Sequence, residues 1–208
     1  MRLKNKKWAR PFIDEHPDLI LNETSFLQAI SSETRPIYLE VGSGKGQFLL
    51  MMGAKQPEAI FFGVERAIPA IAVAGKKLRE QELHNVKFVD ADIESLLPSI
   101  NDQSIAGIYL NFSDPWPKKH HEKRRLTHEK FLVQFMRILK VGALLKIKTD
   151  NDELFAFSQK NVEKLQYNII LSEYSYSTPA SDDAMSEYEQ NFRASNKMIH
   201  RLVIRKDK

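Results

Sequence analysis

The feature that most constrains the fold of this chain is a regular alternation between short apolar runs and longer helical segments. Five runs rich in β-branched and aromatic residues each end at a glycine or a polar residue, and they span 36–42, 59–65, 85–92, 105–111 and 142–150. Segments with helical spacing of apolar residues follow most of them, at 47–56, 71–83, 127–139 and 153–165. Such alternation is typical of βαβ units, whose strands form a parallel sheet.

Two further apolar runs close the chain, at 167–177 and 198–206, and a polar stretch separates them. They predict an antiparallel pair of strands at the end of the sheet. The sequence therefore predicts an α/β fold with a doubly wound, seven-stranded, mostly parallel sheet and an antiparallel C-terminal strand. We expect residues 1–34 to form a basic N-terminal extension with one short helix near 24–32, and residues 35–208 to form the main domain.

An acidic residue ends or follows each of the five predicted parallel strands. These acids are Glu40, Glu65, Asp90 with Asp92, Asp114 and Asp150. Ligands of open α/β sheets bind at the carboxyl ends of the strands, so we expect these side chains to gather at one edge. A single acid there is unremarkable, because Asp and Glu also cap the following helix. Acids after all five strands indicate a binding site.

The loop after the first of these strands discriminates among ligands. It has the pattern G-x-G-x-G, at Gly42, Gly44 and Gly46. The third glycine comes one residue too early for the dinucleotide fingerprint, and the loop lacks the Lys-Ser or Lys-Thr pair of a phosphate-binding P-loop. The carboxylate of Glu40 would repel a pyrophosphate and attract a cation. S-adenosylmethionine carries an ammonium group and a ribose diol, and Glu65 suits the diol while Asp92 suits the adenine amino group. These residues predict S-adenosylmethionine as the cofactor.

Positive charge is concentrated in three segments, although the formal net charge of the 208 residues is only +4. Residues 1–10 and the C-terminal tail are basic, and residues 118–125 hold five Lys or Arg against one acid. Clustered cations are typical of proteins that neutralise a phosphate backbone. We therefore expect a nucleic acid as the partner.

Several other classes of protein are excluded or disfavoured. The sequence has no cysteine, so it has no disulfide framework and no thiolate chemistry. It has no apolar run of about 18 residues that could span a membrane, and its N-terminus lacks the apolar stretch of a secretory signal. We expect a cytoplasmic location and no membrane partner. The six histidines are scattered, so we expect no metal site.

Four segments together resemble the motifs of a known family. They read EVGSGKGQF, FSDPWPKKHHEKRRL, IKTDN and SEYEQNF, and they occur in the family's order. The family is the bacterial tRNA (guanine-N7-)-methyltransferases, which are class I S-adenosylmethionine-dependent enzymes with a Rossmann-like fold. The resemblance runs from WARPF to the end of the chain, and the DPWPKK element with its following basic residues is highly specific. The resemblance implies methylation of the guanine at position 46 in the variable loop of tRNA.

The resemblance also implies roles for individual residues. It implies cofactor contacts at Glu40, Glu65, Asp92 and Asp114. It implies contacts with the substrate at Lys118, Asp150, Ser186, Glu187, Tyr188 and Glu189. It implies contacts with RNA at His120, His121, Glu122, Lys123, Arg124 and Arg125. The chain departs from the family pattern at three positions, where His120 replaces an arginine, Ser186 a threonine and Asn196 a glycine, and none of these changes removes a group that the chemistry needs.

Asp114 is the predicted catalytic residue. Guanine N7 has an exposed lone pair and needs no general base, but the base gains positive charge as it is methylated, and a fixed carboxylate stabilises that charge. Asp114 is also suited to reading the guanine N1–H and N2–H₂ edge or to holding the cofactor, and the sequence leaves these roles open. Trp116, between two stiffening prolines, is suited equally to stacking on a base and to anchoring the core.

Two other functions compete with this one. The first is a class I methyltransferase that acts on another RNA or on a small molecule, although a small neutral substrate would need neither the basic arm nor the basic segment 118–125. The second is an RNA-binding module without catalysis, which leaves the acids Glu40, Glu65 and Asp92 unexplained. The oligomeric state does not follow from the sequence.

Overall fold

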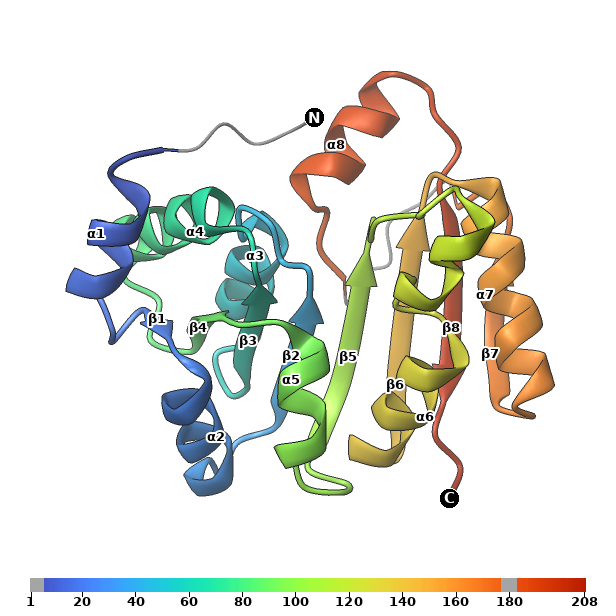
Figure 1. The fold of residues 1–208 in the computed structure, drawn as a ribbon, viewed down its shortest axis with the longest axis horizontal. Helices are drawn as coiled ribbons and strands as arrows, with labels where there is room; N and C mark the ends of the chain where they lie inside the picture. The colour runs from blue at the N-terminus through green and yellow to red at the C-terminus, as the bar shows by residue number, and fades with distance from the viewer. Residues whose placement is uncertain (1–5, 177–182) are drawn as a thin grey trace.

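In the computed structural model, the described residues 6–176 and 183–208 form one eight-stranded sheet flanked by helices (Figure 1). The strands are β1 (Ile20–Leu21), β2 (Ile37–Val41), β3 (Ile60–Glu65), β4 (Val86–Asp90), β5 (Ile105–Asn111), β6 (Leu139–Thr149), β7 (Asn168–Glu173) and β8 (His200–Arg205). The helices are α1 (Ala9–Glu15), α2 (Glu23–Ser32), α3 (Gln47–Lys55), α4 (Ile68–Gln81), α5 (Ile93–Leu96), α6 (Glu129–Ile138), α7 (Asp152–Lys164) and α8 (Glu187–Ala194). Two 3₁₀ turns complete the list, η1 (Leu97–Ser99) and η2 (Lys119–Arg124).

The predicted fold class is confirmed, with one strand more than predicted. The order across the sheet is β1-β4-β3-β2-β5-β6-β8-β7, and among the described strands only the pairs of β8 with β6 and with β7 are antiparallel. The additional strand is β1, whose two residues pair in parallel with Phe88 and Val89 of β4. Two residues show no periodicity, so the sequence alone does not reveal such a strand. Arg2 and Lys4 of the predicted basic arm and Ser177 at the end of a predicted strand lie outside the described residues.

Helices cover both faces of the sheet, which gives the protein two apolar layers. One layer packs side chains of α2, α5, α6 and α7 against the sheet, and the other packs those of α1, α3 and α4. Alternation along β3 shows the division, because Phe62 belongs to the first layer and Phe61 to the second. Along a strand successive side chains point to opposite faces, so strands covered on both sides must be apolar throughout. No helix among the described residues is long and apolar enough to cross a membrane.

Local capping decides where several helices begin. Asn22 caps α2 by accepting a hydrogen bond from the Ser25 N–H. Thr127, the first residue of the predicted helical segment 127–139, is fully buried, and His128 caps α6 by accepting from the Lys130 N–H at 3.2 Å. The polar stretch between the last two predicted strands contains α8, a two-turn helix that was not expected from the sequence.

The order of the strands places a binding edge beside β2. From β2 the chain runs outward to β3 and β4, then returns to the other side of β2 to form β5 and β6. Such a switch point opens a crevice at the carboxyl ends of the two central strands. In Figure 1 the parallel strands point toward α8, which lies over that edge of the sheet. The loops after β2, β3, β4 and β5 therefore lie along this edge of the sheet.

The glycine at the start of α3 yields a first prediction. Gly46 has φ +77°, and a Cβ atom there would lie 2.9 Å from both Phe88 Cε1 and Ala74 Cβ. Gly42 has nearly the same φ, +78°, but nothing lies within 4 Å of the corresponding Cβ position. Gly46→Ala should therefore lower the free energy of unfolding by about 2–5 kcal/mol, from strain plus overpacking. Gly42→Ala should cost only the strain, about 1–2 kcal/mol. Urea unfolding of both variants without added ligand measures the difference, and equal losses would contradict the close packing at Gly46.

Candidate active site

A cavity of about 640 Å³ lies at the carboxyl ends of the central strands. Its walls come from five segments: the glycine loop 42–47, residues 64–67, residues 91–94, residues 111–116 and the start of α8 at 186–188. Glu40, Arg124, Leu126 and Phe131 also line the cavity. The structure thus brings four of the six predicted strand-end acids into one cavity: Glu40, Glu65, Asp92 and Asp114. The other two, Asp90 and Asp150, are not among the lining residues. Asp90 lies 2.8 Å from Arg10, and Asp150 lies 3.6 Å from Lys197 Nζ.

The glycine loop turns sharply because all three of its glycines have positive φ. The N–H of Gly42 donates to the Val64 carbonyl at 2.8 Å, and the N–H of Gly46 donates to the Ser43 carbonyl at 2.9 Å. Gly42 and Gly44 have open space where a side chain would be, whereas Gly46 packs against β4 and α4. The first two glycines therefore keep the cavity open, and the third seats α3 on the sheet.

Glu40 is a buried carboxyl group at the floor of the cavity. Only 2% of the residue is exposed, and Asn111 Nδ2 donates to its Oε1 at 2.8 Å. Burial raises the pKa of Glu40 to about 8, against the lowering effects of the Asn111 hydrogen bond and the charge of Lys148. Three buried polar atoms here have no hydrogen-bond partner among the described residues: Glu40 Oε2, Ser43 Oγ and Asn111 Oδ1. Unpaired buried polar atoms are costly, so this group indicates a polar ligand.

Glu65 and Asp92 are both fixed by backbone donors. Glu65 accepts from the Gly44 N–H at 2.9 Å and from the Ala67 N–H at 2.8 Å, so it bridges the glycine loop and the start of α4. Asp92 caps α5 by accepting from the Glu94 N–H at 3.0 Å, and it lies 3.4 Å from Arg66. Each carboxylate oxygen can accept a second hydrogen bond. Both residues can therefore hold their place and still accept from hydroxyl or amino groups of a ligand.

The loop after β5 carries the predicted catalytic acid. Asp114 is exposed and lines the cavity. On either side of it, Phe112 and Trp116 have positive φ values of 52° and 42°, which are uncommon for residues with a side chain. Trp116 is half-buried at the cavity wall, and the Arg124 guanidinium lies 5.0 Å from its ring centre. Trp116 is thus a wall of the site, with one face occupied by an arginine.

The start of α8 forms the opposite wall. The Ser186 hydroxyl caps the helix by accepting from the Glu189 N–H at 3.1 Å. Glu187 accepts a hydrogen bond from Lys45 Nζ of the glycine loop at 2.8 Å, and this bond is the main cause that lowers the pKa of Glu187. The Tyr188 side chain is largely exposed, and its ring centre lies 6.4 Å from that of Phe112. The helix therefore touches both the glycine loop and the loop of Asp114.

Glu189, a predicted substrate residue, is fully buried in a cluster of four charges. Lys148 Nζ of β6 lies 2.9 Å from Glu189 and 2.8 Å from Asp183. Arg193 donates to the other oxygen of Glu189 through Nε at 3.0 Å and Nη2 at 2.8 Å. Two cations thus balance two carboxylates, and the cluster joins α8 to the sheet. The carboxylate of Glu189 already has partners on both of its oxygens.

The basic segment 118–125, which includes the predicted RNA contacts at 120–125, has two kinds of environment. Lys118, Lys119, His120, Lys123 and Arg124 are exposed, while His121 and Glu122 are half-buried. Arg125 differs from all of them because it is only 5% exposed and donates to the carbonyls of Pro115 and Trp116.

Sequence reasoning missed Lys148, Asn111 and Ser43. Asn111 directly precedes the FSDP motif at the end of β5, and Ser43 and Lys148 lie within the motifs EVGSGKGQF and IKTDN. Lys148 reads as an ordinary strand lysine, because its partners lie 35 and 41 residues further along the chain.

The raised pKa of Glu40 predicts a pH dependence of stability. Between pH 4.5 and about 8 the folded protein keeps a proton that the unfolded chain has released, so stability falls as the pH rises through this window. Glu40→Gln keeps the hydrogen bond from Asn111 but cannot titrate. Its loss of unfolding free energy between pH 5 and pH 8 should be smaller than that of the unaltered protein by about 2–4 kcal/mol. Urea titrations at the two pH values, without added ligand, measure this, and identical losses would contradict the buried protonated carboxyl.

The buried charge cluster predicts a large effect of removing its lysine. Lys148→Met leaves Asp183 and Glu189 buried without their shared cation and should lower the free energy of unfolding by about 3–5 kcal/mol. Lys164→Met removes an exposed ion pair with Glu129 and serves as the control, with an expected loss below about 1 kcal/mol. Chemical unfolding of both variants checks the contrast. A loss at Lys148 no larger than at Lys164 would mean that the cluster does not hold α8 to the sheet.

Comparisons with known proteins find methyltransferases that match almost the whole chain. A family model described as "Putative methyltransferase" matches residues 34–202. The tRNA (guanine-N(7)-)-methyltransferase of Latilactobacillus sakei subsp. sakei (strain 23K) is 41% identical over 97% of this chain and 98% of its own length. The protein of the same name from Oenococcus oeni (strain ATCC BAA-331 / PSU-1) is 42% identical over 94% of this chain and 95% of its own length.

A solved structure confirms the class of fold. A variant of the 16S rRNA (adenine(1408)-N(1))-methyltransferase from Catenulisporales acidiphilia, determined with the cosubstrate SAM, matches with a TM-score of 0.61 at 16% identity and covers 90% of this chain and 92% of that one. At this identity the likeness concerns the fold alone. The full-length relatives and the matching family model go further, and on them the chain belongs to the tRNA (guanine-N7-)-methyltransferase family.

Proposed function

We propose that this protein transfers the methyl group of S-adenosylmethionine to N7 of a guanine in tRNA. The observation that carries the proposal is the cavity in which Glu40, Glu65, Asp92 and Asp114 converge, in a chain that belongs to this family. Within tRNA we propose the guanine at position 46 of the variable loop, which the family motifs imply. A tRNA substrate also supports the cytoplasmic location expected from the sequence.

The residues of the cavity fit the proposed cofactor group by group. The unpaired atoms of Glu40, Ser43 and Asn111 supply two acceptors and a hydroxyl, which suit the ammonium and carboxylate of an amino acid. Glu65 would accept from the ribose hydroxyls, and Asp92 from the adenine amino group. Gly42 and Gly44 leave room for close approach to the backbone. When bound, S-adenosylmethionine supplies an electrophilic methyl group on a sulfonium.

Asp114 supports the reaction through its charge and its position. Guanine N7 attacks with its own lone pair, so the protein needs no general base at this step. The guanine ring becomes cationic, and a carboxylate held near it stabilises that charge at the point where it develops. The remaining contribution to the rate is the alignment of guanine N7 with the methyl group, which the stiff loop 112–117 supports on one side and α8 on the other.

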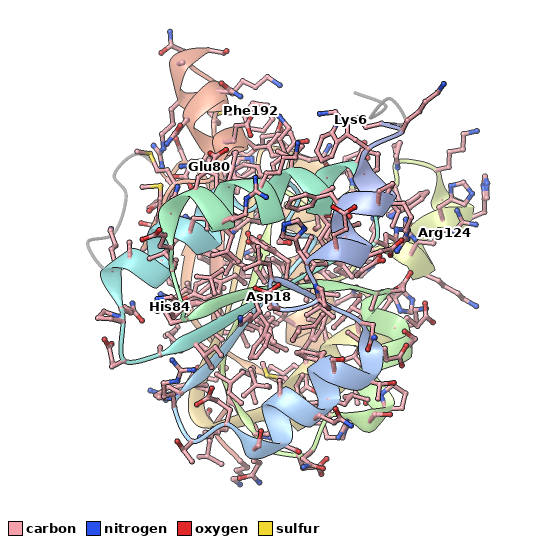
Figure 2. All side chains as sticks on the ribbon, turned by 90° about the vertical axis from the view of Figure 1, so that its left-hand side faces the viewer. Lys6, Asp18, Glu80, His84, Arg124 and Phe192 are labelled. Carbon is pink, nitrogen blue, oxygen red and sulfur yellow. The ribbon has the colours of Figure 1, made fainter. Side chains whose placement is uncertain are left out.

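The exposed cations around the cavity suit the phosphate backbone that carries the guanine. Arg124 lines the cavity itself, and Lys118, Lys119 and Lys123 are exposed residues of the same segment. Lys6 is a further exposed cation from the N-terminal side of the chain, and Figure 2 shows it with Arg124 in the right half of the view. Each phosphate that these residues neutralise releases counterions, so binding should weaken steeply with salt.

A methylation assay tests the proposal directly. The protein is incubated with S-adenosylmethionine and tRNA that lacks modifications, and 7-methylguanine is mapped along the product. We expect one 7-methylguanine in the variable loop at position 46. Methylation of another base would assign the chain a different RNA target, and no transfer to any tRNA would contradict the function.

Asp114→Asn separates the roles that the sequence leaves open for this residue. If the carboxylate stabilises charge on the base, kcat should fall about 10²–10³-fold, while the Kd of S-adenosylmethionine changes less than about threefold. The matched control is Asp14→Asn, an exposed acid of α1. Steady-state kinetics and calorimetric binding give the two quantities. Near-normal kcat would remove Asp114 from catalysis, and an equal loss of cofactor affinity would make it a cofactor ligand instead.

A further inference from the structure

The loop that carries Asp114 has an unusual shortage of hydrogen-bond donors. Two of the four residues in Asp114–Pro117 are prolines, which have no backbone N–H. Such a loop has carbonyl acceptors but few amides with which to bind its surroundings, so its position depends on donors from elsewhere. Trp116 adds to this need, because its φ of +42° lies in a region that a surrounding structure must impose.

Arg125 supplies the missing donors. Its Nε donates to the Pro115 carbonyl at 2.8 Å, and its Nη2 donates to the Trp116 carbonyl at 3.2 Å. One planar guanidinium thus spans two successive carbonyls with two N–H groups in a fixed fork. A face of the group is also covered, because the centre of the Phe157 ring of α7 lies 4.4 Å from the guanidinium carbon. With 5% of the residue exposed, Arg125 is poorly placed to meet a phosphate.

Arg125 is itself attached to the core of the protein. Its N–H donates to the Glu122 carbonyl at 3.0 Å, and its carbonyl accepts from the His128 N–H at 2.9 Å. Two residues on, the buried Thr127 accepts from Ser158 Oγ at 2.9 Å and from Asn161 Nδ2 at 3.0 Å. Both of these partners belong to α7, which packs on the sheet. A continuous set of contacts therefore runs from α7 through Arg125 to the carbonyls beside Asp114.

The neighbouring arginine has the opposite environment. Arg124 is exposed, lines the cavity, and lies over the Trp116 ring at 5.0 Å from its centre. The two adjacent residues carry the same charge, but one meets solvent and the other meets the backbone of the loop. This contrast makes Arg124 a matched control for Arg125.

We infer that Arg125 is a positioning residue that holds the Asp114 loop in its working place, and that it is not a contact to RNA. This inference rests on the proposed function, since it takes Asp114 as the residue to be positioned. Loss of the fork would free the two carbonyls and let Asp114 shift, and small displacements of a catalytic group are enough to lower turnover strongly. The charge of Arg125 would not enter RNA affinity.

The substitution Arg125→Lys gives the sharpest test, because it keeps the charge and removes the fork. We expect kcat with tRNA to fall about 10–100-fold in both Arg125→Lys and Arg125→Ala. The KM for tRNA and the slope of log K against log salt should stay as in the unaltered protein. Arg124→Ala should instead raise the KM and reduce the salt slope by about 0.7–0.9. Normal kcat in Arg125→Lys, or a reduced salt slope in Arg125→Ala, would overturn the inference.

A second readout does not depend on catalysis. Trp116 can be observed alone in a Trp8→Phe background, since the chain has two tryptophans. In cofactor-free protein, Arg125→Lys should red-shift the Trp116 emission and lower its anisotropy as the loop loosens, and unchanged emission would overturn the inference. If the unaltered protein fails to methylate tRNA while these spectra change as expected, the proposed function fails and the structural role of Arg125 stands. Should Arg125→Ala not fold, Phe157→Leu weakens the same support and must show the same spectral change.

Discussion

The ion pairs of the Lys148 ammonium group are the interaction on which the rest of the site depends. The Lys148 side chain, 2% exposed, binds Asp183 and Glu189 and so fixes α8 and the segment before it to β6. The Lys148 carbonyl accepts the Phe112 N–H at 2.8 Å, which sets the start of the loop that carries Asp114. The charge of Lys148 also lowers the pKa of Glu40, although burial has the larger and opposite effect. One residue in the middle of the sheet thus acts on two walls of the cavity and on its floor.

A buried lysine is tolerated here because the cluster around it is electrically balanced. Lys148 and Arg193 face Asp183 and Glu189, and both cations donate hydrogen bonds to the Glu189 carboxylate. Without such bonds the cost of desolvating the charges would exceed their attraction. Glu40 is outside this balance, and its carboxyl keeps a proton instead of a charge at neutral pH. A cationic ligand beside Glu40 would restore the charge and release the proton, which links cofactor binding to pH.

The parts of this structure that could be predicted from sequence are those fixed by local pattern and chain order. The strands from β2 to β6 alternate with helices, and the rule for open sheets then brings Glu40, Glu65, Asp92 and Asp114 to one edge. The strand β1 is too short to show a period, and α8 is short and polar on average, with the charged Glu189 as its buried residue. Pairing between Lys148 and Glu189 spans 41 residues, so only the folded chain reveals it. Arg124 and Arg125 are the same type of residue in the sequence. Their opposite environments depend on which of the two side chains the fold buries against the backbone of the Asp114 loop.

Glu187 and Glu189, both on the first turn of α8, form ion pairs of different strength, and this difference suits the helix to its place at the site. Glu189 is fully buried and holds Lys148, so breaking this pair is costly. Glu187 holds Lys45 of the glycine loop in a pair whose side chains are 41% and 42% exposed, and such pairs contribute at most about 1 kcal/mol. Glu189 therefore holds the helix firmly to β6, whereas Glu187 holds it only weakly to the glycine loop. A ligand can replace the contact between Glu187 and Lys45 at little cost while the Lys148 cluster keeps α8 over the cavity.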